Sequence, residues 1–216
     1  MNTTPSAKRV LVYGDSLPWG AVPGSTAFER FPANVRWPGV LQDILGNDFS
    51  VIEECLCART LDSDDPRLGF EGRNGLSHLV TCLDSQDPID TVIISLGLNE
   101  IKGIYDWTSD QVAEKMKNLV QTIKERKPNF HTVNLRIILL TQPKVQEEKT
   151  GNWGDLWIGS GQKSVDLQAA YRNIADELGI ELCDVAKIVD AGVDGVHIDQ
   201  VSHKIVAEKI AEFFKN

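Results

Sequence analysis

The chain has 216 residues, of which 42% are hydrophobic and 25% charged, and its net charge is −9 at pH 7. This length fits one large domain better than two small ones, and the composition argues against global disorder. The negative charge disfavours binding to nucleic acid or to an anionic membrane surface, because both need a local excess of Lys and Arg. No apolar run approaches the roughly 20 residues that span a bilayer.

Strand-like and helix-like segments alternate along the chain. Strands are predicted for the apolar, often β-branched runs 9–14, 49–53, 90–96, 135–140 and 180–183. Helical spacing of apolar residues predicts helices over 36–45, 76–83, 108–128 and 167–178, and a last helix around 206–214. Such alternation predicts a parallel sheet covered by helices on both faces, in a single domain over residues 1–216.

Two long segments lack a clear period, and loops of this length are usually functional. The first covers residues 56–75 and the second residues 141–161. The second carries Trp153 and Trp157 among glycines. These two aromatic side chains are predicted to be exposed, as part of a lid or a subunit contact.

The cysteines and the start of the chain bear on location and metal binding. Residues 1–8 are polar and lack the apolar segment of a secretion signal. The four cysteines, at positions 55, 57, 82 and 183, form no Cys-x-x-Cys pair, which favours reduced thiols and a cytoplasmic location. No histidines or further cysteines lie near Cys55 and Cys57 at the spacing of zinc ligands, so no metal site is predicted.

Ser16 is the first candidate for chemistry. The first predicted strand stops at Gly14 and is followed by Asp15 and Ser16. This places Ser16 on a loop at the carboxyl end of a strand, the edge where open α/β sheets build their sites. A serine there acts as a nucleophile only if a base and oxyanion donors are positioned beside it.

His197 is the candidate base. It follows the fifth predicted strand in the loop before the last helix, and Asp194 lies three residues before it. A carboxylate there can accept Nδ1–H of the imidazole and leave Nε2 free to take a proton from a serine. Asp199 is a competing acid, and a turn shaped only by Asp194 is the structural alternative. The other histidines are predicted to be surface or structural residues: His78, His131 and His203.

Candidate oxyanion donors follow two further strands. Asn99 follows the third predicted strand, and its side-chain NH₂ can donate at the same edge of the sheet as Ser16. A backbone N–H after the second strand, near Ala58, can point inward there. Together these residues favour acyl transfer over a purely structural role.

Three short motifs then carry a specific resemblance. They are Gly14-Asp15-Ser16-Leu17, Gly97-Leu98-Asn99-Glu100 and Asp194-Gly195-Val196-His197. In their order and spacing the whole chain resembles the SGNH, or GDSL, hydrolase family. Three other segments resemble its arylesterase and acyltransferase branch: Ser16-Leu17-Pro18-Trp19-Gly20, Arg36-Trp37-Pro38 and Val51-Ile52-Glu53-Glu54.

The resemblance implies a fold and a site. The fold is a three-layer α/β/α sandwich with a flavodoxin-like, five-stranded parallel sheet in the order 2-1-3-4-5. The catalytic triad is Ser16, His197 and Asp194, and the oxyanion hole uses the N–H groups of Ser16 and Ala58 and the side chain of Asn99. The family usually has glycine where Ala58 stands, and aspartate where Glu100 stands. No metal or organic cofactor is required.

The predicted activity is hydrolysis of small esters, acetyl esters above all, with acyl transfer to alcohols as a further outcome. Apolar residues beside the catalytic positions are predicted to line the substrate pocket: Leu17, Trp19, Leu98, Val196, Ile198 and Trp153. The sequence leaves open whether the chain forms a homo-oligomer.

Three other functions are compatible with parts of this pattern. An α/β-hydrolase is disfavoured because its serine lies mid-chain in G-x-S-x-G, whereas Pro18 occupies the second position after Ser16. A flavin or nucleotide binder needs a phosphate-cradling loop after the first strand, where Asp15 and Pro18 suit phosphate badly. A catalytically silent carbohydrate-binding or assembly module remains the rival, although it has no need for all the catalytic residue types.

Overall fold

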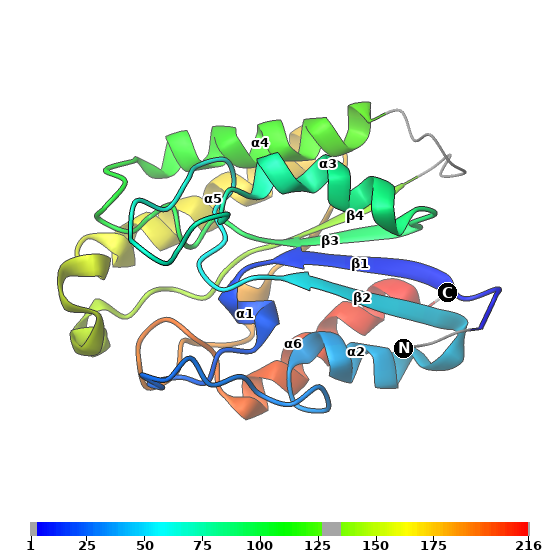
Figure 1. Ribbon diagram of the computed structural model, residues 1–216, viewed down its shortest axis with the longest axis horizontal. Helices are drawn as coiled ribbons and strands as arrows, with labels where there is room; N and C mark the ends of the chain where they lie inside the picture. Colours follow the sequence, from blue (N-terminus) through cyan, green and yellow to red (C-terminus); the bar gives the residue numbers. More distant parts are fainter. Residues whose placement is uncertain (1–3, 127–134, 216) are drawn as a thin grey trace.

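A five-stranded parallel sheet lies between two layers of helices in the computed structural model, which describes residues 4–126 and 135–215 (Figure 1). The sheet order is β2-β1-β3-β4-β5, which confirms the predicted flavodoxin-like topology. The strands are β1 (Lys8–Gly14), β2 (Phe49–Cys55), β3 (Thr91–Ser95), β4 (Arg136–Leu140) and β5 (Glu181–Cys183). His131, predicted as a surface residue, lies outside the described ranges.

The two faces of the sheet are covered by different helices (Figure 1). One face is covered by α2 (Trp37–Leu45) and α6 (Gln200–Ala211), which pack against each other. The other face is covered by α3 (Gly75–Gln86), α4 (Ser109–Glu125) and α5 (Ser160–Leu178). Shorter helical segments complete the described chain: α1 (Ser16–Trp19), η1 (Gly46–Asp48), η2 (Glu147–Lys149), η3 (Gly151–Trp157), η4 (Val185–Lys187) and η5 (Glu212–Phe214).

The central strands form the core because both of their faces are covered. Every residue of β3 is buried, as are Val10 to Gly14 of β1, whereas β2 at the edge of the sheet is mostly half-buried. Parallel strands buried on both faces are continuous apolar runs rather than alternating ones. This explains why β1 and β3 were predicted most clearly from sequence.

The ends of the helices follow the expected local chemistry. The Thr108 side chain accepts a hydrogen bond from the Gln111 N–H, and the Gln111 side chain accepts one from the Thr108 N–H. This reciprocal capping box begins α4, as its sequence indicated. Gly179 ends α5 in the left-handed conformation, with φ of 60°.

The segment 141–161 differs from its prediction as an open loop. It contains the short helices η2 and η3, and α5 begins before the segment ends. Trp157 is buried with 4% of its surface exposed, and Trp153 is half-buried. The expectation of an exposed aromatic lid or subunit contact is therefore wrong for Trp157. Within the described ranges, no helix combines the length and apolarity that crossing a bilayer requires.

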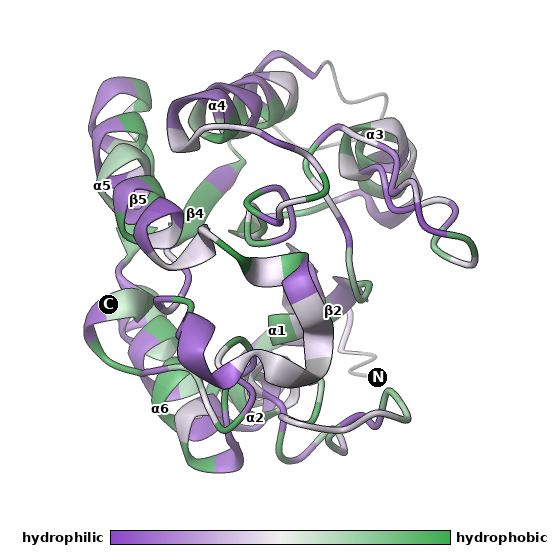
Figure 2. Ribbon diagram, turned by 90° about the vertical axis from the view of Figure 1, so that its left-hand side faces the viewer, coloured by the Kyte–Doolittle hydropathy of each residue, from purple (hydrophilic) through white to green (hydrophobic). Residues whose placement is uncertain are grey.

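All strands run in one direction, so their carboxyl ends share one edge of the sheet. Figure 2 looks onto that edge, where α1 lies among the connecting loops. In the strand register Gly14 pairs with Cys55 of β2 and with Ser95 of β3, so these three strands end level. Residues a few positions beyond each strand end are thereby brought together.

Candidate active site

Ser16 is the first residue of α1, rather than a loop residue as predicted. Asp15 caps this short helix, because its Oδ1 accepts a hydrogen bond from the Leu17 N–H at 3.0 Å. The turn into α1 requires glycine at position 14, since a Cβ there would lie 2.3 Å from Cγ of Pro18. The chain therefore reverses sharply at the strand end and holds Ser16 at the sheet edge.

His197 and Asp194 lie opposite Ser16 on the loop before α6. The His197 Nε2 lies 3.0 Å from Ser16 Oγ, and the His197 Nδ1 lies 2.7 Å from Asp194 Oδ2. The tight turn between acid and base uses Gly195, whose φ is 75° and whose Cβ, if present, would lie 2.3 Å from the Gln146 carbonyl oxygen. The structure thus brings the three residues together as a hydrogen-bonded chain.

Asp194 is held by more than the imidazole. Its Oδ1 accepts the N–H groups of Val196 and His197 at 3.0 and 2.9 Å, and its Oδ2 also accepts the Gly24 N–H at 3.0 Å. Burial alone raises the pKa of this carboxyl, but the hydrogen bonds from His197 and the backbone outweigh burial and lower the pKa to about 2. The acid is therefore an ionised acceptor, which favours the proton of His197 on Nδ1 and leaves Nε2 facing Ser16.

Asp199, the competing acid in the sequence, has a different position. Its Oδ1 accepts the Ser202 N–H at 2.8 Å and caps the start of α6. His203 is fully buried in α6, and its Nδ1 accepts the Trp37 N–H at 3.2 Å. Both residues support α6, which follows the His197 loop, and neither contacts Ser16.

The predicted oxyanion donors line the same pocket as Ser16 and His197. Ala58 has a φ of 63°, the left-handed conformation in which the family's usual glycine is relaxed and alanine is strained. Asn99 is buried, and its Nδ2 donates to the Arg59 carbonyl at 2.9 Å. The Arg59 carbonyl belongs to the turn after β2, and Nδ2 also donates to Asp15 Oδ2 at the longer distance of 3.5 Å.

Lys102 contributes to this site and was missed in the sequence. It is 4% exposed, lines the pocket, and its Nζ donates to Asn99 Oδ1 at 2.5 Å. Because Nζ is a donor and the Arg59 carbonyl is an acceptor, both neighbours require the same orientation of the Asn99 amide. Burial, followed by the Arg67 charge, lowers the pKa of Lys102 to about 8. The three-residue spacing from Asn99 was the only signal of Lys102 in the sequence.

Glu100 joins the loops after β2 and β3. It is fully buried, and its Oε1 accepts the Leu61 N–H, three residues beyond Ala58. Its Oε2 has no hydrogen-bond partner among the described residues. Burial raises the pKa of Glu100 to about 8, so the side chain is mostly protonated at neutral pH. Burial also raises the pKa of Asp15 to about 6, against the opposing hydrogen bond from Leu17.

The substrate pocket differs from its prediction. Leu17, Leu98, Val196 and Ile198 are each at most 4% exposed, pack within the core and do not line the pocket beside Ser16. Trp19 also lies outside that lining, under the Arg30 guanidinium at 5.0 Å. Leu17 and Trp19 lie in the short helix α1, and Leu98, Val196 and Ile198 lie in turns and irregular segments, so closeness in sequence to Ser16, Asn99 or His197 does not direct these five side chains into the pocket. Trp153 does line it, with other residues that the sequence did not indicate: Val22, Phe28, Arg67, Phe70, Leu156 and Trp157.

Comparisons with known proteins agree with this geometry. The model of the GDSL-like lipase/acylhydrolase family matches residues 12–202. No curated protein matches the sequence at a significant level.

Three solved structures are similar to this chain over almost its whole length. The aryl esterase of M. smegmatis is 34% identical, with a TM-score of 0.90, and the match covers 96% of this chain and 98% of that one. The carbohydrate acetylesterase Est24 of Sinorhizobium meliloti is 29% identical, with a TM-score of 0.90 and the same coverages. A putative arylesterase of Agrobacterium tumefaciens is 31% identical, with a TM-score of 0.85, over 96% of this chain and 98% of that one.

The fold, the geometry of the site and the similarity to known esterases together show that the chain is an ester-hydrolysing serine hydrolase. The chain belongs to the GDSL-like lipase/acylhydrolase family, and within it resembles the aryl esterases.

The burial of Glu100 leads to a prediction about how stability depends on pH. The pKa of Glu100 rises from 4.5 to about 8 on folding, so between these two pH values the folded state keeps a proton that the unfolded state has lost. The free energy of unfolding should therefore fall as the pH rises through this window, by up to about 1.4 kcal/mol per pH unit. Glu100→Gln keeps an acceptor for the Leu61 N–H and removes the ionisation, so urea unfolding at pH 5.5 and 8 should show a smaller fall. The exposed Glu114→Gln is the control, and an unchanged fall in Glu100→Gln would contradict the assignment.

The hydrogen bond from Lys102 to Asn99 leads to a prediction about catalysis. Lys102→Met removes the donor that fixes the Asn99 amide, while retaining most of the side-chain volume. We expect kcat for p-nitrophenyl acetate to fall by about ten- to 100-fold, less than the loss of an entire oxyanion donor, with little change in KM. Lys102→Arg should restore part of kcat because it retains a cationic donor. Lys204→Met, on the exposed part of α6, is the control, and an unaltered kcat in Lys102→Met would exclude this role.

Proposed function

We propose that residues 1–216 form one catalytic domain that hydrolyses small carboxylic esters, acetyl esters above all, through an acyl-enzyme on Ser16. The observation that carries this proposal is the hydrogen-bonded chain of Ser16, His197 and Asp194, with heavy-atom distances of 3.0 and 2.7 Å. These are the separations at which a base can take the proton of an attacking hydroxyl.

Acylation begins at Ser16. Its Oγ attacks the ester carbonyl carbon while His197 Nε2 takes the hydroxyl proton, and the carbonyl electron pair moves to the oxygen. The adjacent Asp194 carboxylate stabilises the imidazolium that results. His197 then gives the proton to the leaving alkoxide, the ester C–O bond breaks, and the acyl group remains on Ser16.

The oxyanion of each tetrahedral intermediate is assigned to the N–H groups of Ser16 and Ala58 and to Asn99 Nδ2. All three residues line the pocket that His197 also lines, which supports this role. The strained φ of Ala58 is consistent with a backbone N–H held in a fixed direction at a functional turn. Such preorganised donors are the main source of rate in acyl transfer.

Deacylation reverses these steps with a second nucleophile. Water attacks the acyl carbon as His197 takes its proton, and Ser16 leaves with that proton to regenerate the hydroxyl. An alcohol in place of water gives a new ester, which is acyl transfer. The aromatic walls of the pocket, Trp153, Trp157 and Phe70, favour apolar alcohols over water near the acyl group.

The bulky aromatic lining of the pocket supports a small acyl group. Trp153 packs its ring edge-on against the His197 ring, with centroids 6.0 Å apart, and Trp157 is buried beside Lys102. These two indoles come from η3 and line the pocket that also holds Ser16. The aryl esterase and carbohydrate acetylesterase likenesses point in the same direction. A catalytically silent carbohydrate-binding or assembly module does not need Ser16 and His197 in contact, and no feature of the site favours it.

Hydrolysis of p-nitrophenyl acetate tests the proposal. Ser16→Ala should lower kcat by about 10⁴-fold or more, and Asp194→Asn by a similar factor because the imidazole loses its orientation. Ser202→Ala, at the start of α6, is the matched control and should match the wild type. Equal rates in the wild type and Ser16→Ala would remove the nucleophile assignment, and a wild type without turnover would support the silent module.

The same assay with longer esters tests the acyl preference. We expect kcat/KM to fall from acetate to butyrate to octanoate, because the indoles of Trp153 and Trp157 leave little room for added methylenes. Trp153→Ala should enlarge the pocket and reduce this discrimination. A wild type that prefers octanoate would contradict the acetyl proposal while leaving the triad intact.

A further inference from the structure

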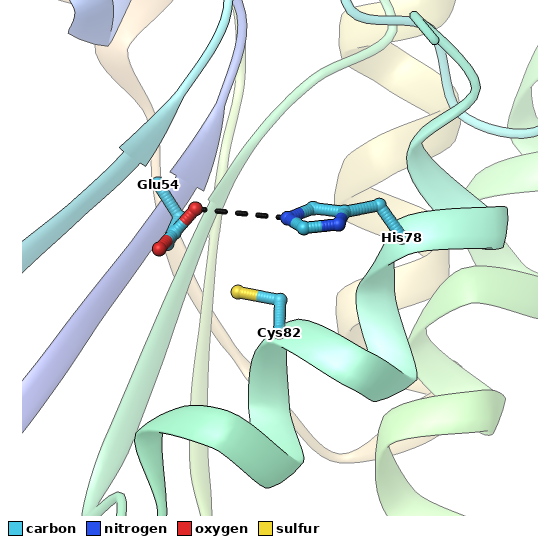
Figure 3. A group of neighbouring side chains, drawn as sticks. All are labelled: Glu54, His78 and Cys82. Carbon is cyan, nitrogen blue, oxygen red and sulfur yellow. Dashed lines mark ion pairs between the residues drawn. The ribbon is translucent and has the colours of Figure 1, made fainter.

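Three side chains outside the catalytic pocket face one another between the edge strand and its neighbouring helix. Glu54 lies near the end of β2, and His78 and Cys82 lie one turn apart on α3. Figure 3 shows the carboxylate, the imidazole and the thiol pointing toward a shared space. None of the three lines the pocket that holds Ser16.

The facing atoms are close but not hydrogen-bonded to one another. The possible ligand atoms of the three residues all lie within 4.8 Å of one another, and Glu54 Oε2 is 3.7 Å from His78 Nε2. In the described part of the chain, the only hydrogen bond to the Glu54 carboxylate comes from Gln86 Nε2 at 3.4 Å, on the other oxygen. The Oε2–Nε2 separation of 3.7 Å is too long for a hydrogen bond, and among the described residues no hydrogen bond joins either atom to Cys82 Sγ, so all three atoms can turn to one shared ligand.

We propose that Glu54, His78 and Cys82 bind a divalent transition-metal ion of the zinc type. Thiolate, imidazole and carboxylate are the ligands that Zn²⁺ takes in proteins, and three of them leave one tetrahedral position for water. Metal–ligand bonds of about 2.0–2.3 Å need ligand atoms roughly 3.3–3.7 Å apart. The half-exposed Glu54 and exposed His78 side chains can rotate to close the remaining distance around the fixed Cys82.

The charges of the site define what binding must do. Burial raises the pKa of the Cys82 thiol to about 12, so the thiol holds its proton until the ion displaces it. When the ion binds the His78 imidazole, the Glu54 carboxylate and the Cys82 sulfur, the thiol loses its proton. Each complex formed therefore releases one proton. Tyr13 stacks on His78, and the Arg59 guanidinium lies 4.3 Å from the centre of that Tyr13 ring. The positive charge of Arg59 repels a bound metal ion. The negative charges of the Glu54 carboxylate and the Cys82 thiolate are both needed to offset this repulsion.

The position of the site gives it a consequence for the catalytic pocket. The ion would join the end of β2 to α3, and the segment between them, residues 56–74, carries Ala58. The same segment contributes Cys57, Arg67 and Phe70 to the pocket wall. A cross-link that closes this segment reduces its conformational freedom. Metal binding should therefore stabilise the turn that presents the Ala58 N–H.

No ligands at zinc-like spacing surround Cys55 and Cys57 in the sequence, and the prediction of no metal site depends on that pair alone. The proposed ligands combine His78 and Cys82, at helical i, i+4 spacing, with Glu54 from another element. Only the packing of α3 against β2 brings the third ligand to the first two.

Titration of the reduced protein with Co²⁺ tests the site directly. We expect one ion per chain, with the near-ultraviolet absorption of a thiolate–cobalt bond and release of one proton. Cys82→Ser should abolish this absorption. His78→Gln and Glu54→Gln should each weaken binding by at least about 100-fold, which exceeds the usual effect of altering a residue that only hydrogen-bonds to a metal ligand. Cys183→Ser, a buried thiol on β5, is the matched control and should bind as the wild type does.

A second measurement guards against unfolded variants. His78 has 46% of its side chain exposed, so His78→Gln should keep the fold. One equivalent of Zn²⁺ should raise the urea midpoint of the wild type but not of His78→Gln. Absence of the thiolate band in the folded wild type overturns the proposal. So does binding that persists in Cys82→Ser and disappears in His197→Ala, since that result assigns the ion to the catalytic histidine.

Discussion

The Asp194 carboxylate is the group on which the rest of the site depends. It receives the imidazole N–H at 2.7 Å, and its own loop and the loop at Gly24 supply three backbone N–H groups. These bonds keep the acid ionised, with a pKa of about 2, and they fix the protonated nitrogen of His197. Asp194, His197 and their loop are therefore one hydrogen-bonded unit, and Ser16 lies at Nε2, the ring nitrogen that Asp194 leaves free.

The parallel sheet supplies that placement. Because β1, β2 and β3 end level, Ser16, Ala58 and Asn99 emerge from neighbouring strands at the same height. Buried polar groups then set their directions: Asp15 caps the Ser16 helix, and Lys102 orients the Asn99 amide. The cost of burying these groups is visible in the raised pKa of Asp15 and the lowered pKa of Lys102. Such conflicts between burial and charge are typical of functional sites.

Much of this arrangement could be predicted from the sequence, and the reason is local. Strand runs, the α4 capping box and the short motifs after the strands depend on neighbouring residues. The sheet order followed from the resemblance of those motifs to the GDSL family, as did the grouping of Ser16, His197 and Asp194. Pocket walls could not be predicted in this way. Leu98 and Ile198 are adjacent to Asn99 and His197 in sequence yet pack in the core, whereas Phe70 and Trp157 reach the pocket from distant segments. Lys102 and the set of Glu54, His78 and Cys82 likewise depend on packing between elements.

The structure of the enzyme after reaction with a p-nitrophenyl phosphonate ester tests the central claim most directly. The phosphonate should be bonded to Ser16 Oγ, because it imitates the tetrahedral intermediate. Its phosphoryl oxygen should then lie within hydrogen-bond distance of the Ser16 and Ala58 N–H groups and of Asn99 Nδ2, with His197 Nε2 facing the leaving-group side. An adduct on another residue, or a phosphoryl oxygen turned away from Ala58 and Asn99, would contradict the account.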